Sequence, residues 1–349
     1  MPRHVFVPSY VEQNSDGSWR TIGAGDPDSK VEWLAAVYSD RPLTTALRTD
    51  PDGPAVAISS SSKPGLMIRM LETLEVTNTD RVLEIGTGTG YNAGLLCHRL
   101  GDRQVASVDI EAQLVELAAK RLAMIGFHPT LAAGDGANGL PDAKPFDRII
   151  ATCSVSRVPA DWIDQLAPRG RILTDLKLTG AAGNLVDLRR DEPDGLVGRF
   201  LPKWAGFMPL RQTEEHPAAA APAAIERRTT VPSATPWWDN PVMWFLAALH
   251  LPAGVTTGMR LDPRTGTPTM SRMHSTNGEW VETALEPGPD GHRAVIGSAA
   301  DLWQHVENAH DVWHTLGEPS WDRFGLTVAG ADHTVWLDHP TSKHHWPLP

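Results

Sequence analysis

The stretch VLEIGTGTGY, residues 82–91, decides the fold class that the sequence predicts. An apolar, strand-like run here meets a glycine-rich turn, and a second strand-like run follows at residues 105–109. The residues between them, 92–100, are typical of a helix. Strand, loop, helix and strand together predict a βαβ crossover, with the loop at the carboxyl end of the first strand. Open α/β sheets bind their ligands at that end.

The glycines of this loop suit a ligand-binding turn. Gly86, Gly88 and Gly90 can adopt a positive φ and let a ligand lie against the backbone, where a Cβ would block it. A dinucleotide-binding loop would carry a third glycine in a GxGxxG spacing, but Tyr91 stands at that position. A tight strand-to-helix turn without any ligand is the plain structural alternative.

Acidic residues accompany three successive predicted strands. Glu84 precedes the loop, and Asp135 follows a later strand in LAAGDG. Asp109 closes the second strand about twenty residues past the loop, where an acid can hold ribose hydroxyls. Three acids at strand ends favour S-adenosylmethionine over NAD as the ligand.

Composition and charge set the outer bounds. At 349 residues the chain is long enough for two domains with a generous core, and 41% of its residues are hydrophobic. A formal net charge of −11 without a basic run argues against a nucleic-acid partner. No apolar run approaches about 20 residues, and the start, MPRHVFVPSY, lacks a signal-peptide core. We therefore expect a soluble, cytoplasmic protein without a membrane partner.

The cysteines and histidines do not predict a metal or redox site. Cys97 and Cys153 lack the spacing of such motifs and are expected to be small buried hydrophobic residues. His305 and His310 lie five residues apart, on different faces of a predicted helix, and the pair at 344–345 lies in a polar tail. No metal is expected.

A serine run precedes another predicted helix, ISSSSKPGLMIRMLETLEV at residues 58–76. Pro64 suits the first turn of that helix. The residues expected on its buried face are Leu66, Met70, Leu71 and Leu74. A hydroxyl-rich helix N-terminus with unpaired N–H groups would suit an anion such as a carboxylate. Simple N-capping of the helix by Ser62 is the alternative.

Strands and helices continue to alternate after the loop. A predicted helix at residues 110–127 is followed by a strand in PTLAAGDG. FDRIIATC, residues 146–153, is a continuous apolar run of the buried parallel kind. VPADWIDQL then predicts a helix, GRILTDL a strand, and the residues around DEPDG further strands. This alternation predicts an α/β fold with a doubly wound parallel sheet.

SSSSKPGLMIRMLETL, VLEIGTGTGYNAGLL, VDI, GDG and PFDRIIATC, in this order, resemble the protein-L-isoaspartate O-methyltransferase family over residues 30–212. That family methylates side-chain carboxylates with S-adenosylmethionine. The resemblance implies a Rossmann-like methyltransferase fold, a ribose-binding acid at Asp109, adenine contacts near Asp135 and Gly136, and a functional serine at Ser62. The chain departs from the family at the serine run, where repair enzymes usually show Thr-Ile-Ser.

Two sets of site residues follow. The predicted cofactor-binding set is Glu84, Gly86, Thr87, Gly88, Gly90, Tyr91, Asp109, Ile110, Asp135 and Gly136. A carboxylate is already a nucleophile at neutral pH, so we expect positioning to dominate catalysis. The predicted catalytic set is therefore the hydroxyls and adjacent N–H groups of Ser60, Ser61 and Ser62.

The remaining chain predicts a second, smaller domain. An alanine- and proline-rich run predicts a linker at 213–236. Beyond it lie a hydrophobic helix in WWDNPVMWFLAALHL, a meander with a hairpin turn at Asn277-Gly278, a further helix and the strands RFGLTVAG and HTVWLD. The predicted layout is an N-terminal segment at 1–50 packing on the core, a methyltransferase domain at 51–212, the linker, and an α+β domain at 237–349 as a candidate for peptide recognition.

Side-chain expectations in the second domain concern one helix and the tryptophans. Ser298 and Asp301 are expected to cap the later helix. Its predicted buried face is Leu302, Val306, Ala309, Val312 and Leu316. The tryptophans expected in the core are Trp237, Trp238, Trp244, Trp280, Trp303, Trp313, Trp321 and Trp336. A peptide groove lined by some of them is the alternative.

The whole layout, including YSDRPL and the RFGLTV and VWLD segments, resembles the methyltransferases that accompany ATP-grasp peptide maturases (graspetide systems) in actinobacteria. This resemblance implies a ribosomal precursor peptide as partner, already cross-linked, whose aspartate becomes a methyl ester and then an aspartimide. Repair of isoaspartate in damaged proteins is an alternative with the same chemistry. A subunit that binds a precursor peptide without catalysis is an alternative of another class.

Overall fold

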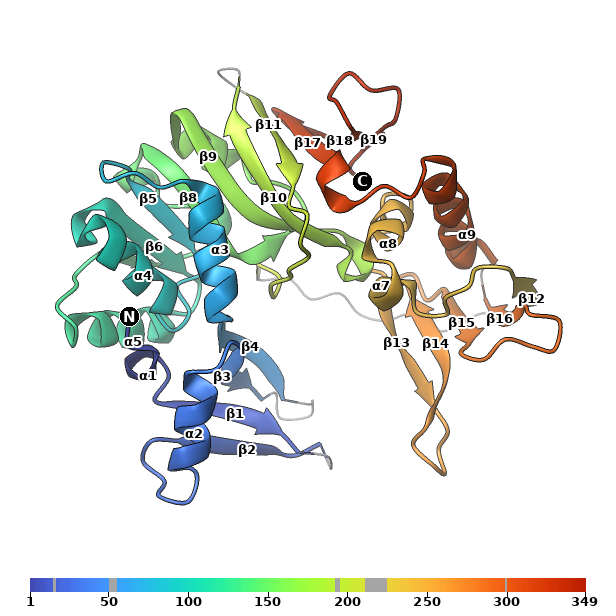
Figure 1. Ribbon diagram of the computed structural model, residues 1–349, viewed down its shortest axis with the longest axis horizontal. Coiled ribbons are helices and arrows are strands. Elements are labelled where there is room, and N and C mark those ends of the chain that lie inside the picture. The colour runs from blue at the N-terminus through green and yellow to red at the C-terminus, as the bar shows by residue number, and fades with distance from the viewer. Residues whose placement is uncertain (15–16, 50–54, 192–194, 211–224, 299) are drawn as a thin grey trace. The chain divides into compact units, whose positions relative to one another are not determined.

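The computed structural model describes residues 1–349 except 15–16, 50–54, 192–194, 211–224 and 299 (Figure 1). It divides into two compact units. The first comprises Met1–Cys153, Pro159–Thr174 and Asp187–Gly195, and the second comprises Ser154–Val158, Asp175–Val186 and Leu196–Pro349. The units are therefore interleaved along the chain, whereas the sequence predicted domains in linear succession.

The N-terminal part of the first unit forms its own antiparallel sheet, with the strand order β2-β1-β3-β4. Its elements are α1 (Arg3–Phe6), β1 (Ser9–Gln13), β2 (Trp19–Gly23), α2 (Lys30–Val37), β3 (Leu43–Arg48) and β4 (Val56–Ser61). Phe6, Ile22 and Trp33 of this part share one buried cluster with Tyr91 and Leu122. The N-terminal segment thus packs against the rest of the first unit.

The remainder of the first unit alternates helices and strands. Its elements are α3 (Pro64–Leu74), β5 (Val82–Ile85), α4 (Tyr91–Leu100), η1 (Asp102–Gln104), β6 (Val105–Asp109), α5 (Ala112–Ala123), β7 (Thr130–Ala133), η2 (Gly136–Asn138), η3 (Pro141–Ala143), β8 (Phe146–Val155), α6 (Ala160–Gln165), β9 (Leu166–Lys177) and β10 (Gly183–Arg190), the last two continuing into the second unit. The strands run in the order β10-β9-β8-β5-β6-β7. β5 is parallel to both β6 and β8, and β6 is parallel to β7.

This strand order confirms the predicted doubly wound fold. The chain moves outward from β5 to β6 and β7, and then returns to place β8 on the other side of β5. Such a reversal opens a crevice at the carboxyl ends of the two central strands, where α/β proteins bind ligands. All of β5 and β6 is buried, as a parallel sheet with covered faces requires.

The helix predicted after the serine run is α3, and both of its ends are anchored within the first unit. Its buried residues are Met67, Met70 and Leu74, whereas Leu66 and Leu71 are half-buried. The serines before it belong mainly to strand β4 rather than to its first turn. At its other end the chain turns at Glu75, which takes a left-handed conformation (φ 50°).

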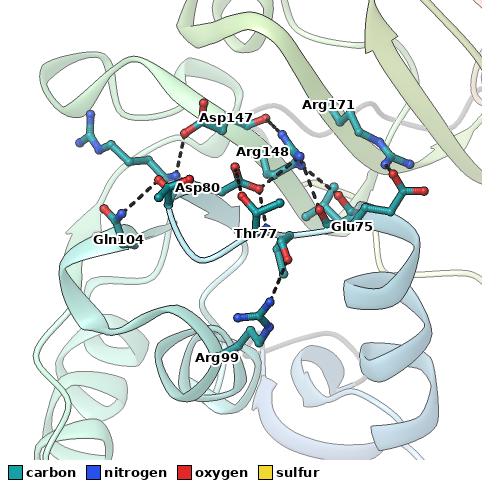
Figure 2. Close-up of polar contacts among 12 residues, drawn as sticks. Glu75, Thr77, Asp80, Arg99, Gln104, Asp147, Arg148 and Arg171 are labelled. Carbon is teal, nitrogen blue, oxygen red and sulfur yellow. Dashed lines mark hydrogen bonds and ion pairs between the residues drawn. The ribbon is translucent and has the colours of Figure 1, made fainter.

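A polar network fixes the loop that follows α3 (Figure 2). Arg148 lies 3.2 Å from Asp80 through Nη2. Arg171 lies 2.7 Å from Glu75 through Nη1 and 2.6 Å from Asp187 through Nη2. Asp187 and Arg171 are largely buried, whereas the Glu75 side chain is 67% exposed. Arg171 Nη2 also donates to the Thr73 carbonyl oxygen of α3 at 2.6 Å. Asp187 holds Arg171 in place, so this buried bond contributes more to fixing the end of α3 than the exposed Glu75 contact does.

The second unit contains two sheets. One has the order β19-β18-β17-β11-β10, and the other, antiparallel, has the order β12-β16-β15-β14-β13. The elements are η4 (Thr179–Ala181), β11 (Gly195–Phe200), β12 (Ile225–Thr229), α7 (Pro236–Asp239), α8 (Pro241–Ala248), β13 (Thr256–Leu261), β14 (Pro268–His274), β15 (Trp280–Ala284), β16 (Arg293–Gly297), α9 (Ala300–Thr315), η5 (Trp321–Arg323), β17 (Phe324–Ala329), β18 (Asp332–Leu337) and β19 (His345–Pro347).

Several expectations for this region need correction. The strands of RFGLTVAG and HTVWLD, β17 and β18, were expected within the domain at 237–349, but they continue the sheet of β11, which lies inside the range 51–212 predicted for the methyltransferase domain. Of the linker predicted at 213–236, residues 213–224 lie outside the described residues, and residues 225–229 are strand β12, paired with β16. A strand there was not predicted because the alanine and proline composition dominates the run.

The hairpin turn and the core tryptophans are largely confirmed. Gly278 has φ 87° between β14 and β15, as the Asn-Gly signal requires. Trp244, Trp303, Trp321 and Trp336 are buried, while Trp237, Trp280 and Trp313 are half-buried. Trp238 is 63% exposed, so the core prediction is wrong for it. This residue belongs to the four-residue helix α7, which has only one buried position, Pro236.

The face predicted for α9 is correct only in its first half. Leu302, Val306 and Ala309 are buried, but Val312 is 39% exposed. The Ser298 hydroxyl accepts from the Trp280 N–H at 2.8 Å, so that side chain binds strand β15, and the predicted cap at Asp301 falls on a side chain outside the described residues. No helix among the described residues is long and apolar enough to span a bilayer.

Candidate functional site

The glycine loop lies between β5 and α4 at the carboxyl edge of the parallel sheet. Gly86 has φ +94°, and a Cβ there would lie 2.8 Å from Thr152 Oγ1 of β8. That hydroxyl donates to the Gly86 carbonyl at 2.7 Å. Gly90 has φ +85°, and its Cβ would lie 3.0 Å from the Ala118 Cβ. Both glycines are therefore required by backbone conformation and close packing together.

Asp109 ties the loop to the end of β6. One of its carboxylate oxygens accepts from the Gly88 N–H at 2.8 Å, and the other accepts from the Glu111 N–H at 3.1 Å. Its carbonyl accepts from the Gly134 N–H at 2.9 Å, which brings the end of β7 alongside. A carboxylate oxygen has two lone pairs, so each oxygen of Asp109 retains capacity to accept from a ligand hydroxyl.

Asp135 and Gly136 begin the short helical turn after β7. Asp135 Oδ1 accepts from the Ala137 N–H at 2.9 Å, and the side chain is half-buried. The Gly136 carbonyl accepts from Trp162 Nε1 at 2.8 Å. The structure thus places Gly88, Asp109 and Asp135 at consecutive strand ends of one sheet, as the sequence predicted.

Glu84 lies inside the protein rather than at the surface of the site. It is 0% exposed, and it accepts from Ser107 Oγ at 2.6 Å and from Asn92 Nδ2 at 2.8 Å. Ser107 Oγ is also 2.6 Å from Thr87 Oγ1 of the loop. Burial, with a smaller contribution from the charge of Asp109, raises the pKa of Glu84 to about 7, against the opposing effect of the two hydrogen bonds.

The predicted cofactor contacts of Glu84, Thr87 and Tyr91 stay predictions. Glu84 and Thr87 point into the internal network, which favours an indirect role in shaping the loop. The Tyr91 ring is 9% exposed and packs edge-to-face on Phe6, with 5.8 Å between ring centroids. Ile110, by contrast, is half-buried directly after Asp109.

The serine run alternates along strand β4, as strand residues do. Ser59 and Ser61 are buried, and both hydroxyls accept hydrogen bonds: Ser59 from Thr45 Oγ1 and Ser61 from Arg3 Nε, each at 3.2 Å. Ser60 and Ser62 are half-buried, and their hydroxyls have no hydrogen-bond partner among the described residues. Of the three predicted catalytic serines, Ser60 and Ser62 are therefore available to a ligand, whereas the Ser61 hydroxyl faces the interior.

The serine strand and the glycine loop meet at Gly88. A Cβ on Gly88 would lie 3.7 Å from Ser59 Oγ and 3.8 Å from the Ser60 carbonyl oxygen. The structure thus brings together two motifs that are separated by about 25 residues in sequence, as a crossover into the parallel sheet allows. The predicted cofactor-binding loop and the strand that carries the predicted serines therefore lie next to each other within the first unit.

The predicted capping of α3 by Ser62 is wrong. The N-cap residue is Lys63, and it makes no side-chain capping bond. Instead Asp40 Oδ1 accepts from the Gly65 N–H at 2.7 Å, and Lys63 Nζ lies 3.3 Å from Asp40 Oδ2. The bond from Gly65 is the main cause that holds the pKa of Asp40 below its ordinary value. This helix terminus was predicted to bind a substrate carboxylate, but in the structure it binds a carboxylate of the chain itself, Asp40.

Sequence reasoning missed three polar partners of the site, Thr152, Asn92 and Ser107. Thr152 lies in the apolar run of β8, and only its position next to the switch point of the sheet gives it a role. Asn92 and Ser107 serve Glu84, which the sequence placed in contact with the ligand. Strand alternation was the available signal for Ser59, because reading the run as a strand separates Ser59 and Ser61 from Ser60 and Ser62.

Both cysteines are buried, as predicted, and they are not joined in a disulfide; burial raises the pKa of Cys97 to about 12. Across the described ranges, no group of three or more His, Cys, Asp and Glu residues has the arrangement of a metal site.

Comparison with known proteins gives the family. The family model "Protein-L-isoaspartate(D-aspartate) O-methyltransferase (PCMT)" matches residues 30–214. A protein-L-isoaspartate O-methyltransferase of Methylorubrum extorquens is 40% identical over 211 residues, covering 60% of this chain and 76% of that protein. One of Thermotoga maritima is 33% identical over 144 residues, covering 41% of this chain and 45% of the relative, so the match spans less than half of the Thermotoga protein.

A solved structure entitled protein-L-isoaspartate O-methyltransferase matches with a TM-score of 0.51 and 22% sequence identity. The match covers 88% of this chain and 89% of that one, and at this identity it supports the fold alone. The family match, over residues 30–214, includes the serine run, the glycine loop and the acids of the site. The chain therefore belongs to the protein-L-isoaspartate(D-aspartate) O-methyltransferase family.

Proposed function

We propose that this protein is an S-adenosylmethionine-dependent O-methyltransferase that methylates an aspartyl-type carboxylate in a peptide. The observation that carries the proposal is the contact at Gly88, where the loop held by Asp109 meets the strand that presents Ser60 and Ser62. A methyl-transfer site needs a cofactor position and a carboxylate position side by side. The loop suits the first and the serine strand suits the second.

The residues of the loop fit S-adenosylmethionine. Gly86 and Gly88 leave the backbone open, and Asp109 retains acceptor capacity for ribose hydroxyls. Asp135 and Gly136 lie at the next strand end, where an adenine ring would be held. When bound, this cofactor would supply a methyl group on a positively charged sulfur atom. The chain would hold it through Gly88, Asp109 and Asp135.

The chain itself then needs only to orient the substrate. A carboxylate is ionised at neutral pH, so no general base is required for its oxygen to attack a methyl carbon. The unpaired hydroxyls of Ser60 and Ser62 can each donate one hydrogen bond to that carboxylate. One oxygen of the carboxylate must keep a lone pair that can attack the methyl carbon, and a carboxylate has about four lone-pair positions for donors and attack together.

For the substrate, we propose a ribosomal precursor peptide, already cross-linked, whose aspartate becomes a methyl ester. The following backbone nitrogen would then attack the ester carbonyl, lose its proton and expel methanol, which gives an aspartimide. Support comes from the serine run in place of Thr-Ile-Ser and from the resemblance of the whole layout to the maturase-associated methyltransferases. The five-stranded sheet of the second unit could supply binding energy remote from the reacting carboxylate.

Repair of isoaspartate is the second candidate, and the names of the relatives favour it. The solved structure with that title matches over 88% of this chain, so a C-terminal extension is not in itself a sign of peptide maturation. A third reading, a peptide-binding subunit without catalysis, requires that S-adenosylmethionine does not bind.

One panel of substrates tests these proposals. The full-length protein is incubated with S-adenosylmethionine and a cross-linked precursor, its linear form, or a generic isoaspartyl peptide, and mass spectrometry follows methyl gain and then methanol loss. Fast methylation of the cross-linked peptide alone supports maturation, and equal or faster methylation of the isoaspartyl peptide refutes it in favour of repair. No methyl gain on any peptide, with no cofactor binding by calorimetry, refutes the methyltransferase proposal.

A further inference from the structure

Arg3 is a buried arginine that binds the end of the serine strand. Its side chain is 2% exposed, although arginine is rarely buried without a partner of opposite charge. Nη2 donates to the carbonyl oxygens of Ser61 at 3.0 Å and Ser62 at 3.1 Å, and Nε donates to Ser61 Oγ at 3.2 Å. The remaining bonds go to the carbonyl oxygens of Val37, Ser39 and Arg41.

The two serine carbonyls determine where the neighbouring N–H groups point. The Ser61–Ser62 and Ser62–Lys63 peptide bonds are trans, because the cis bond found in the described chain is Lys144–Pro145. In a trans peptide the C=O and N–H bonds are antiparallel. Since both carbonyls point at Arg3, the N–H groups of Ser62 and Lys63 point away from it. Among the described residues neither N–H has a hydrogen-bond partner.

The charge of Arg3 is not neutralised by a contacting acid. No carboxylate of the described residues lies within ion-pair distance of its guanidinium, which is held instead by neutral oxygens. Burial is the main cause that lowers the pKa of Arg3, yet arginine remains charged. The charged or titratable groups that act on it are Tyr91, Asp40 and Arg41. Behind the two free N–H groups there is thus a fixed positive charge in a poorly solvated position, where its field is weakly screened.

We propose that Arg3 is the positioning residue of the substrate carboxylate: it fixes the Ser61 and Ser62 peptides so that the N–H groups of Ser62 and Lys63, with the Ser62 hydroxyl, receive one carboxylate. The inference rests on the proposed function. It adds that Arg3 is the source of the positive potential that attracts the substrate carboxylate to a chain of net charge −11. Two successive N–H groups that both face away from Arg3 and lack a partner among the described residues can donate to the two oxygens of one carboxylate. Arg3 polarises these peptides from the far side and does not touch the substrate.

The experiment compares three full-length variants. Arg3→Gln removes the charge, and Arg3→Lys retains it with fewer donors. Arg20→Gln is the control, because Arg20 lies in the same N-terminal sheet but is exposed and, among the described residues, forms its ion pairs with Glu12 and Glu32. For each variant the measurements are the melting temperature, the affinity for S-adenosylhomocysteine, and the affinity of a fluorescent isoaspartyl hexapeptide for the protein saturated with that compound.

We expect Arg3→Gln to weaken peptide binding about tenfold or more, with the affinity for S-adenosylhomocysteine changed by less than about twofold. Arg3→Lys should bind the peptide more tightly than Arg3→Gln but less tightly than the wild type. The control Arg20→Gln should bind the peptide as tightly as the wild type does. Because burial favours the neutral form of a lysine, the recovery should be larger at about pH 6.5 than at about pH 9. Equal losses of peptide and cofactor affinity in Arg3→Gln, or wild-type peptide affinity, would overturn the proposal.

Other outcomes remain informative. If Arg3→Gln does not fold, a pH-independent peptide affinity in Arg3→Lys would count against a role for the charge, and the pH-dependent recovery would support it. If the wild type binds the peptide but methylates none of the three panel substrates, the methyltransferase proposal fails while the binding comparison still judges Arg3. If the wild type binds the cross-linked precursor but not the hexapeptide, the same comparison of variants is made with the precursor, and if it binds neither, this carboxylate site is refuted.

Discussion

Replacing Glu84 with glutamine should make the protein more stable at neutral and alkaline pH. The change keeps the geometry, because a glutamine oxygen can accept from Asn92 Nδ2 while its amide donates to Ser107 Oγ. The serine hydroxyl can then donate to Thr87 Oγ1, which lies 2.6 Å away. The variant therefore removes a buried charge without removing a hydrogen bond.

The magnitude follows from the raised pKa. Burial raises the pKa of Glu84 from 4.5 to about 7, so the folded state binds the proton more tightly than the unfolded state does. At about 1.4 kcal/mol for each tenfold change in the proton equilibrium, the charged form costs about 3 kcal/mol of stability above pH 7. A carboxyl group whose pKa is raised in the folded state destabilises that state when it ionises, so this cost appears as the pH rises from 4.5 through about 7.

The assay is urea unfolding of the wild type and the Glu84→Gln variant across this pH range. The difference in unfolding free energy should grow in favour of glutamine by about 2 kcal/mol between about pH 5.5 and about pH 7.5, and then level off. Parallel curves for the two proteins would show that the carboxyl group titrates normally, and the internal network described for Glu84 would be wrong. A Glu84→Ala variant, which leaves a cavity, should be less stable than both at every pH.

Three further predictions concern the site and its support. Asp109→Ala should weaken S-adenosylmethionine binding about 5- to 150-fold, because a lost pair of hydrogen bonds costs about 1–3 kcal/mol, and unchanged calorimetric affinity would remove this acid from the site. Ser62→Ala should lower turnover more than cofactor affinity, whereas wild-type turnover would show that its hydroxyl does not orient the carboxylate. Arg171→Leu should cost about 3 kcal/mol of unfolding free energy, because it leaves the largely buried Asp187 without this partner. Glu75→Gln, which changes the contact with Arg171 drawn in Figure 2, should cost less than about 1 kcal/mol because Glu75 is 67% exposed. Similar losses of unfolding free energy in the two variants would contradict this difference between the buried and the exposed contact.

The parts of the fold that the sequence predicted are those where local signals and tertiary packing agree. The glycine loop is an example: Gly86 and Gly90 adopt positive φ, and both also approach neighbouring side chains closely. The parallel strands were predictable because burial on two faces demands continuous apolar runs, such as the one in β8. The class of the fold follows from these runs and from the helices between them.

The parts that the sequence did not predict depend on long-range partners. Nothing local distinguishes RFGLTVAG as a strand of the sheet of β11 from a strand of the meander, because both places accept an alternating apolar strand. Similarly, Glu84 has the residue type of a cofactor ligand, but its hydrogen bonds to Ser107 and Asn92 bring it inside the protein. Carboxylates that face a ligand and carboxylates that are buried inside the protein both occur next to apolar runs, so spacing in the sequence alone does not distinguish them.

The serine run shows how the N-terminal segment determines which polar groups remain available before α3. Local propensity places four serines at a helix start, yet β3 pairs with them and makes Ser59–Ser61 a strand. Asp40, from the same segment, takes the Gly65 N–H that a substrate carboxylate would otherwise find, and Arg3 takes the serine carbonyls. On the proposal for Arg3, the substrate carboxylate would therefore lie at the peptide N–H groups of Ser62 and Lys63 and not at the first turn of the helix. Residues at the start of the chain, far in sequence from the glycine loop, would in this way decide which carboxylates the enzyme can accept. The departure from Thr-Ile-Ser would then affect the choice of substrate through these contacts.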